Sequence, residues 1–349
     1  MAVDLAQLVS KRKITFEELT GKTVAVDAYN VLYQFLSIIR SADGTPLMDS
    51  HGNVTSHLSG LFYRNIELMG YGVKPVYVFD GIPSILKQRT IEARMKRRTE
   101  AAEAWKTAVE EGRMEEAKSY AQASTRINKE IVASAKVLLG HMGIPFINAP
   151  SEGEAQASHM AKKGLVYAAA SQDYDTMLFG SPYVIRNLTM SGKRKLPRKN
   201  VYINVEPELM SFEDTLKSLG LNQKQLIWLG ILLGTDFNEG VKGVGPKTAL
   251  KIVKDAKSID DIKKYVHDKY STDFELDIRE VEGLFLNPEV NEISQGEFDK
   301  IMSVRPDREK VAEFMCKEHD FSEERIGKFS EKLVESGKAS RQKGMGNWL

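Results

Sequence analysis

Carboxylate side chains occur in two closely spaced pairs in this sequence. The pairs are Glu152 with Glu154 and Asp173 with Asp175. Each pair directly follows an apolar stretch that is typical of a buried β-strand, which places it at the C-terminal end of that strand. Ligands of open parallel sheets bind beyond those ends, so the four acids are expected to face one cleft. Crowded anions raise one another's pKa unless cations compensate them, which points to a divalent metal site.

A structural role is the alternative for both pairs. Ser151 and Glu154 fit the capping-box pattern at the start of a helix, and for Glu154 taken alone we favour the cap. Glu152 has no place in that pattern, and the glycine between the two glutamates suits a turn that points them together. Asp173 and Asp175 could be ordinary loop acids. The number of further strand-end acids decides between these interpretations.

Three more acids stand in the same context. Asp27 ends a short β-branched strand, Asp80 ends the apolar strand 75–79, and Asp236 follows a strongly apolar helix. Repetition at strand after strand favours a metal-binding cleft over coincidence. The alternation of strands and helices predicts an α/β fold, with a central, mostly parallel twisted sheet and helices on both faces.

The segment 82–131 interrupts this alternation with a basic stretch and a helical run. Lys87 and Arg94 are seven residues apart and share one face of a helix. The default interpretation is a solvated charged face. A helical arch that carries cations over the acidic cleft would instead suit a polyanionic substrate. Tyr33 lies in the helix after Asp27, where it either packs in the core or offers a stacking platform near the cleft.

Two later segments could contact phosphate groups. An acid-free run contains Lys193, Arg194 and Lys195, and a flexible surface turn is nearly as good an interpretation of it. A glycine-rich turn at 240–246 opens a helix with a proline at its start, which exposes backbone N–H groups and the positive helix end. The expected backbone-gripping contacts of this helix-hairpin-helix-like turn are Gly243, Gly245 and Lys247.

Composition sets the remaining limits. A length of 349 residues suggests about two domains. Lys and Arg number 49 against 48 Asp and Glu, so the net charge of +1 does not by itself indicate a nucleic-acid partner. The single cysteine, Cys316, fits a reducing compartment, and no apolar run is long enough to cross a membrane. We therefore expect an intracellular protein, cytoplasmic or nucleoid-associated.

The sequence resembles the flap endonucleases of the structure-specific 5′ nuclease family, and most of all their archaeal form. The resemblance covers essentially the whole chain. It rests on five motifs: Val26-Asp27 with Tyr33-Gln34-Phe35, Val78-Phe79-Asp80-Gly81, Ala149-Pro150-Ser151-Glu152-Gly153-Glu154-Ala155, Ala170-Ser171-Gln172-Asp173-Tyr174-Asp175 and Gly234-Thr235-Asp236.

The resemblance implies a PIN-like 5′ nuclease fold with a two-metal site. One metal would be held by Asp27, Asp80, Glu152 and Glu154, and the second by Asp173, Asp175 and Asp236. It also implies that Lys87 and Arg94 polarise the scissile phosphate and that Tyr33 stacks on the neighbouring base. The motifs contain no histidine, and such an all-oxygen site independently favours Mg²⁺ or Mn²⁺ over Zn²⁺. The number of ions, two Mg²⁺ with Mn²⁺ able to substitute, is what the resemblance implies.

The implied organisation has three parts. Residues 1–236 form the nuclease core with the arch at 82–131, residues 237–336 form a helical duplex-binding region that starts with a helix-two-turn-helix motif, and residues 337–349 form a tail. In relatives the duplex-binding turn also holds a monovalent cation. The tail residues that match the sliding-clamp-binding box are Gln342, Met345, Trp348 and Leu349.

Two residues depart from the family pattern. Leu349 replaces an aromatic residue of the clamp box, which affects the affinity for the clamp, and Ala2 replaces the usual glycine near the active site. The chain lacks the long basic extension of eukaryotic relatives, as archaeal members do.

The implied activity is cleavage of DNA at the base of 5′ flaps, with 5′–3′ exonuclease activity, by a monomer in Okazaki fragment maturation and repair. The flap would thread through the arch. Two alternatives remain open: a PIN-type ribonuclease, and a non-catalytic DNA-binding module tethered to the clamp. The basic arch, the duplex-binding turn and the complete set of acids argue against them.

Overall fold

The computed structural model of the protein describes residues 5–41, 43–190, 192–195 and 202–328. Its centre is a sheet that comprises, in the described part of the chain, seven strands in the order β1-β9-β6-β5-β2-β3-β4. A separate hairpin pairs two further strands, β7 and β8. The strands are β1 (Lys11–Lys13), β2 (Thr23–Asp27), β3 (Lys74–Phe79), β4 (Phe146–Asn148), β5 (Ala168–Ala170), β6 (Tyr183–Arg186), β7 (Gly192–Lys195), β8 (Tyr202–Val205) and β9 (Glu208–Ser211).

The four strands that precede the acid motifs are neighbours in the sheet. Strands β5, β2, β3 and β4 lie side by side and run parallel, with Val26 opposite Ala170 and Phe79 opposite Asn148. Their C-terminal ends therefore meet at one edge of the sheet. Strands β1 and β9 form an antiparallel margin at the other side. The predicted fold class, a mostly parallel α/β sheet, is confirmed.

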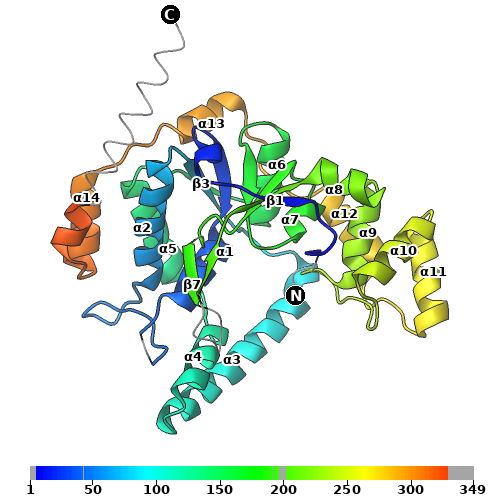
Figure 1. Cartoon of the computed structure of the whole chain (residues 1–349), viewed down its shortest axis with the longest axis horizontal. Helices are drawn as coiled ribbons and strands as arrows, with labels where there is room; N and C mark the ends of the chain where they lie inside the picture. Colours follow the sequence, from blue (N-terminus) through cyan, green and yellow to red (C-terminus); the bar gives the residue numbers. More distant parts are fainter. Residues whose placement is uncertain (1–4, 42, 191, 196–201, 329–349) are drawn as a thin grey trace, which may run out of the picture.

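Helices cover both faces of this sheet (Figure 1). Side chains alternate across β2, so Val24 and Val26 join one core and Ala25 joins another. The first core contains α1 (Ala28–Ile38), α2 (Ser56–Gly70) and α5 (Lys129–His141). The opposite face is covered by α6 (Gly153–Lys162) and, next to it, by α7 (Asp175–Leu178), α8 (Phe212–Leu219) and α9 (Gln223–Leu233).

A helical hairpin projects from the body between β3 and α5 (Figure 1). After the short 3₁₀ turn η2 (Ile85–Lys87), α3 (Gln88–Glu110) packs against α4 (Met114–Ala123). The hairpin is attached near α1, because the Trp105 Nε1–H donates to the Asp43 carbonyl at 3.2 Å and Arg40 donates to the Thr125 hydroxyl at 2.8 Å. Its projecting helices end at Ala123, and α5 belongs to the core.

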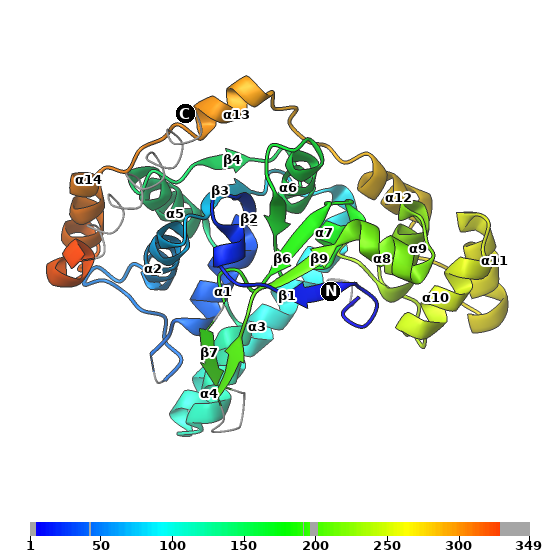
Figure 2. The same cartoon turned by 45° about the horizontal axis from the view of Figure 1, so that its top comes forward.

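The remaining helices extend the molecule on both sides of the sheet (Figure 2). They are α10 (Pro246–Asp255), α11 (Ile259–Tyr270), α12 (Ile278–Leu286), α13 (Gln295–Ile301), α14 (Arg308–Ala312) and a π-helical turn, η3 (Glu313–Glu318). Beyond α12 the chain passes the edge strand β4, where Asn291 Nδ2–H donates to the Asn148 carbonyl at 2.9 Å. It then returns to α5. None of the described helices is both long and apolar enough to cross a lipid bilayer.

Candidate active site

The ends of β2 and β3 place the first two acids. Asp27 is the last residue of β2 and caps α1, since its Oδ1 accepts the Asn30 N–H at 3.0 Å. Asp80 follows β3 and accepts the Gly153 N–H at 2.7 Å, so it caps α6 from the neighbouring strand. A Cβ atom on Gly153 would lie 2.6 Å from that carboxylate oxygen, which explains the glycine between the two glutamates.

The predicted capping box at Ser151 is wrong. The helix starts at Gly153 with Glu152 as its N-cap residue, and no side chain caps it locally. The reason is tertiary, because Asp80 already accepts the first N–H of the helix. Glu154 is consequently free for other contacts, and its Oε1 accepts from the Ser171 hydroxyl at 2.6 Å and from the Thr176 hydroxyl at 2.8 Å.

Three acids come from the opposite side of the site. Asp173 and Asp175 follow β5, and Asp173 Oδ2 accepts from the Asn30 side-chain amide at 3.2 Å. Asp236 arrives from the end of α9, where Gly234 takes a φ of 93° that glycine adopts readily. The Asp236 N–H points to Asp175 Oδ2 at 3.4 Å. The loop after α9 therefore docks directly on the β5 acids.

Burial and mutual repulsion shift the ionisation of the acids. Burial, aided by Asp80, raises the pKa of Asp27 to about 8. Burial also raises the pKa of Asp80 to about 6, although Lys87 opposes the shift. Burial raises the pKa of Glu154 well above its usual range, and Asp173, Asp27 and Asp175 add to the effect. The site thus lacks enough positive charge to keep Asp27 fully ionised at neutral pH.

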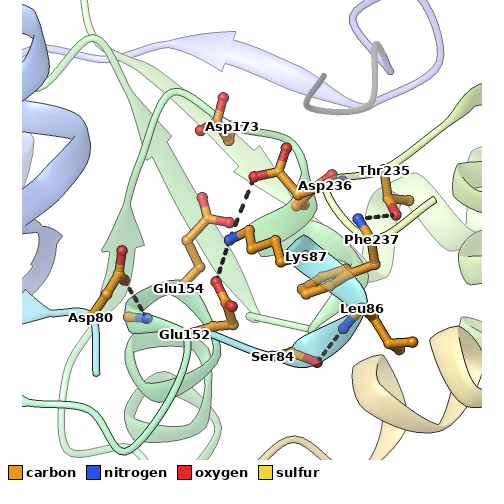
Figure 3. A network of polar contacts seen from close by, with 12 residues as sticks. Asp80, Ser84, Leu86, Lys87, Glu152, Glu154, Asp173, Thr235, Asp236 and Phe237 are labelled. Atoms are coloured by element: carbon orange, nitrogen blue, oxygen red, sulfur yellow. Dashed lines mark hydrogen bonds and ion pairs between the residues drawn. The ribbon is translucent and has the colours of Figure 1, made fainter. Parts of the chain in front are cut away.

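Two cations from the start of the projecting hairpin reach this cluster, and Figure 3 shows one of them, Lys87, between Glu152 and Asp236. The Lys87 ammonium forms ion pairs with Glu152 and, at 3.5 Å, with Asp236, and the Arg94 guanidinium pairs with Asp236. Burial opposes the ionisation of Asp236, but Lys87 and Arg94 outweigh it and lower the pKa of this carboxyl. The same carboxylates raise the pKa of Lys87 above its ordinary value despite its burial. Both basic residues therefore contact the acid cluster directly.

The other predicted contact residues lie around the cluster or outside the described chain. Tyr33 is half-buried on α1, and the Arg98 guanidinium lies over its ring at 5.5 Å from the centroid. Gly243, Gly245 and Lys247 are exposed at the start of α10. The backbone of Lys193, Arg194 and Lys195 forms β7. Ala2 and the clamp-box residues Gln342, Met345, Trp348 and Leu349 lie outside the described residues.

Sequence reasoning missed the neutral side chains that hold the acids. Ser171 donates to Glu154 and also approaches Asp27 at 3.3 Å, so one hydroxyl joins the ends of β5 and β2. Thr176 holds Glu154 from α7, and Asn30 holds Asp173 from α1. The only available signal was their position beside the acids in sequence. Their partners are set by how the strands align.

The donor set suits a hard divalent cation. It consists of carboxylate oxygens, which accept hydrogen bonds from neighbouring hydroxyl and amide groups. Mg²⁺ and Mn²⁺ prefer such hard oxygen ligands. Two basic side chains face seven carboxylates. Among the described residues, no three potential ligands already converge as they would around one ion, and Glu152 and Asp236 are instead engaged by Lys87 and Arg94.

Known proteins resemble this chain over its whole length. Flap endonuclease 1 of Thermococcus onnurineus and that of Pyrococcus furiosus are each 50% identical to it, over 100% of this chain and 99% of the relative. The chain belongs to the flap endonuclease family. Residues 1–101 match the XPG N-terminal domain and residues 143–236 match the XPG I-region, so the two matched regions of the family flank most of the projecting hairpin.

Solved structures agree with this membership. The flap endonuclease-1 from Methanococcus jannaschii is 37% identical and superposes with a TM-score of 0.73, over 96% of this chain and 98% of that one. The catalytic core of Rad2 in complex with a DNA substrate is 25% identical, with a TM-score of 0.67, over 95% of this chain and 100% of that one. The flap endonuclease fold is therefore present from end to end of the described chain.

Proposed function

We propose that the protein is a structure-specific nuclease that hydrolyses DNA phosphodiesters at the base of 5′ flaps, with 5′–3′ exonuclease activity. Its place would be Okazaki fragment maturation and DNA repair. The observation that carries the proposal is the set of ion pairs by which Lys87 and Arg94, at the start of the projecting hairpin, contact Glu152 and Asp236 of the acid cluster. The close relatives named flap endonuclease 1 support it.

The activity would depend on two Mg²⁺ ions, with Mn²⁺ able to substitute. Asp27, Asp80, Glu152 and Glu154 would hold one ion, and Asp173, Asp175 and Asp236 the other. Bound in this way, such ions supply an activated water and stabilise the leaving oxygen. The raised pKa of Asp27, about 8, supports the assignment, because a divalent cation would allow this buried acid to ionise at neutral pH.

Lys87 and Arg94 would orient the scissile phosphate. Each already contacts an anionic oxygen of the cluster, and a phosphate entering there offers the same charge and hydrogen-bonding geometry. Tyr33 would stack on the base beside that phosphate, in exchange for its contact with Arg98. The hairpin helices α3 and α4 would thus be the arch through which the 5′ flap threads.

Duplex DNA would bind beside the arch. The turn at 240–246 presents exposed Gly243, Gly245 and Lys247 together with the N-terminal end of α10, which suits a backbone phosphate. A monovalent cation would bind at this turn. Lys193, Arg194 and Lys195 of the β7–β8 hairpin would supply further phosphate contacts. In this scheme residues 1–236 are the nuclease core and residues 237–336 the duplex-binding region.

The tail 337–349 would tether the enzyme to a DNA sliding clamp. Gln342, Met345, Trp348 and Leu349 would enter a clamp pocket, and such buried aromatic anchors carry much of the affinity of small interfaces. The enzyme itself would act as a monomer on each branched DNA.

Cleavage of a substrate panel tests the proposed activity. The panel consists of labelled double-flap DNA, a blunt duplex, single-stranded DNA and single-stranded RNA of one sequence, each with Mg²⁺ or with a chelator. We expect Mg²⁺-dependent incision at the flap base and much slower cutting of the other substrates. Preferential cutting of single-stranded RNA would point to a PIN-type ribonuclease. Flap binding without any cutting would point to a non-catalytic module.

A further inference from the structure

Three neutral side chains form a hydrogen-bonded chain that ends on Asp173. The Thr189 hydroxyl donates to Gln34 Oε1 at 3.1 Å, Gln34 Nε2–H donates to Asn30 Oδ1 at 2.5 Å, and Asn30 Nδ2–H donates to Asp173 Oδ2 at 3.2 Å. We propose that this chain, hereafter the Thr189 relay, is a positioning device that turns the Asp173 carboxylate toward the metal. The inference rests on the proposed function.

The relay has one direction. A primary amide carries an acceptor oxygen on one side and a donor nitrogen on the other. A hydroxyl can donate or accept, whereas the ionised Asp173 carboxylate only accepts, so the carboxylate is the group that requires the nitrogen of Asn30 to face it. The oxygen of Asn30 then faces Gln34, and its nitrogen faces the carboxylate. The nitrogen of Gln34 accordingly faces Asn30 and its oxygen faces Thr189, whose hydroxyl donates to it and so stabilises both amides in the orientation that satisfies Asp173.

The fold keeps the three members in place. Asn30 and Gln34 are four residues apart on α1 and so share one face of that helix. Thr189 is buried, at 4% exposure, in the loop after β6, behind Leu188, which packs in the core. All three line a small hollow between α1 and the ends of β5 and β6. Rotation of either amide would leave a half-buried polar group facing the wrong partner, which is costly.

The relay acts from behind the metal site and not within it. Lys87 and Arg94 reach Glu152 and Asp236 from the arch side, whereas Asn30 reaches Asp173 from α1. Groups that orient a metal-ligating carboxylate typically change metal affinity by ten- to a hundredfold when they are removed. Positioning by the relay therefore predicts a loss of metal affinity that does not require DNA, substrate or turnover.

Calorimetric titration of the DNA-free protein with Mg²⁺ tests the relay. Thr189→Val removes the first donor at equal size, and Thr189→Ser restores it. We expect about a tenfold weaker Mg²⁺ affinity for Thr189→Val and parental affinity for Thr189→Ser. Asn30→Ala should weaken Mg²⁺ binding at least as much. Gln34→Glu should weaken it most, because an ionised carboxylate cannot donate to Asn30 and would turn the Asn30 oxygen toward Asp173.

Matched variants separate the possible outcomes. Ser37→Ala lies on the same helix, bonds to Thr125 outside the relay, and should keep parental Mg²⁺ affinity. Parental affinity in Asn30→Ala and Thr189→Val, beside a loss in Asp173→Ala, would overturn the relay alone. Parental affinity in Asp173→Ala would overturn the metal site itself. If Thr189→Val does not fold, the half-buried Asn30 and Gln34 variants still decide the matter.

Discussion

Burial, aided by repulsion within the acid cluster, makes the ionisation of single residues such as Asp27 oppose folding. Asp27 has a folded-state pKa of about 8, whereas an unfolded aspartate titrates at about 3.9. Between those values the folded protein retains a proton that the unfolded chain releases. The metal-free fold therefore loses stability as the pH rises through this window. A bound cation is expected to reverse the loss, since it takes the place of the proton.

Asp27→Asn tests this linkage. Asparagine keeps the cap on α1, because its side-chain oxygen can still accept the Asn30 N–H. In the presence of a metal chelator, Asp27→Asn should have a higher melting temperature than the parent. The difference between the two melting temperatures should grow from pH 5 to pH 8.5. The control variant is Asp307→Asn. Asp307 caps α14, and the Lys310 N–H lowers the pKa of its carboxyl. The difference in melting temperature between this variant and the parent should therefore stay constant over that range. A margin for Asp27→Asn that shrinks with pH would contradict the account.

At the scale of elements, the strand-end acids could be read from the sequence but their partners could not. An apolar run followed by an acid locates Asp27 and Asp80, because strand length and burial are local properties. The hydroxyl of Ser171 and the amide of Asn30 gain their roles only when β5 aligns beside β2. The capping box failed for the same reason, since Asp80 on the neighbouring strand supplies the cap of α6.

The turn before α10 contains a glycine with a positive φ, and its contribution to stability and to duplex binding can be tested. Gly243 has a φ of 87°, so Gly243→Ala should lower the free energy of unfolding by about 1 kcal/mol and weaken duplex binding. Gly245 has an ordinary φ of −94° and no atom within 4 Å of an added Cβ. Gly245→Ala adds no backbone strain and should cost about 1 kcal/mol or less, because alanine is a poorer N-cap residue than glycine, while its methyl group obstructs a phosphate at the helix end.

Denaturant unfolding and fluorescence anisotropy with a labelled duplex measure the two quantities. Gly296→Ala, in the open first turn of α13, serves as the control for an added methyl group. It should raise the free energy of unfolding by up to about 1 kcal/mol and leave DNA affinity unchanged. Equal DNA affinity of all three variants would remove the turn from the duplex-binding surface.

At the scale of the whole molecule, net charge conceals the expected binding surface. The chain carries only +1, yet the arch, the β7–β8 hairpin and the turn before α10 each contain basic residues in the sequence, which we propose to contact phosphates. About five phosphate contacts predict that log affinity falls with log salt at a slope of about −4. Lys247→Gln should reduce that slope by about 1, whereas Lys310→Gln on α14 should not change it. A slope near zero for the parent would contradict the surface.

The tail concerns a second partner and is tested separately. Removal of 342–349 should leave cleavage of small flap substrates unchanged, because every residue assigned to the acid cluster or the arch precedes residue 237. Stimulation of cleavage by the sliding clamp, and binding to the clamp, should both be lost. The change Trp348→Ala alone should give most of the same effect. Undiminished clamp binding after truncation would refute the assignment of the tail.

The central claim is that the acid cluster holds the metal ions that cut flapped DNA. Its most direct test is the single-turnover rate of double-flap incision by the parent and by Asp173→Ala over a Mg²⁺ titration, with flap binding measured in parallel in Ca²⁺. We predict incision at the flap base that requires Mg²⁺ and falls by at least about a hundredfold in Asp173→Ala, while flap affinity changes little. Incision by Asp173→Ala at the parental rate would contradict the claim.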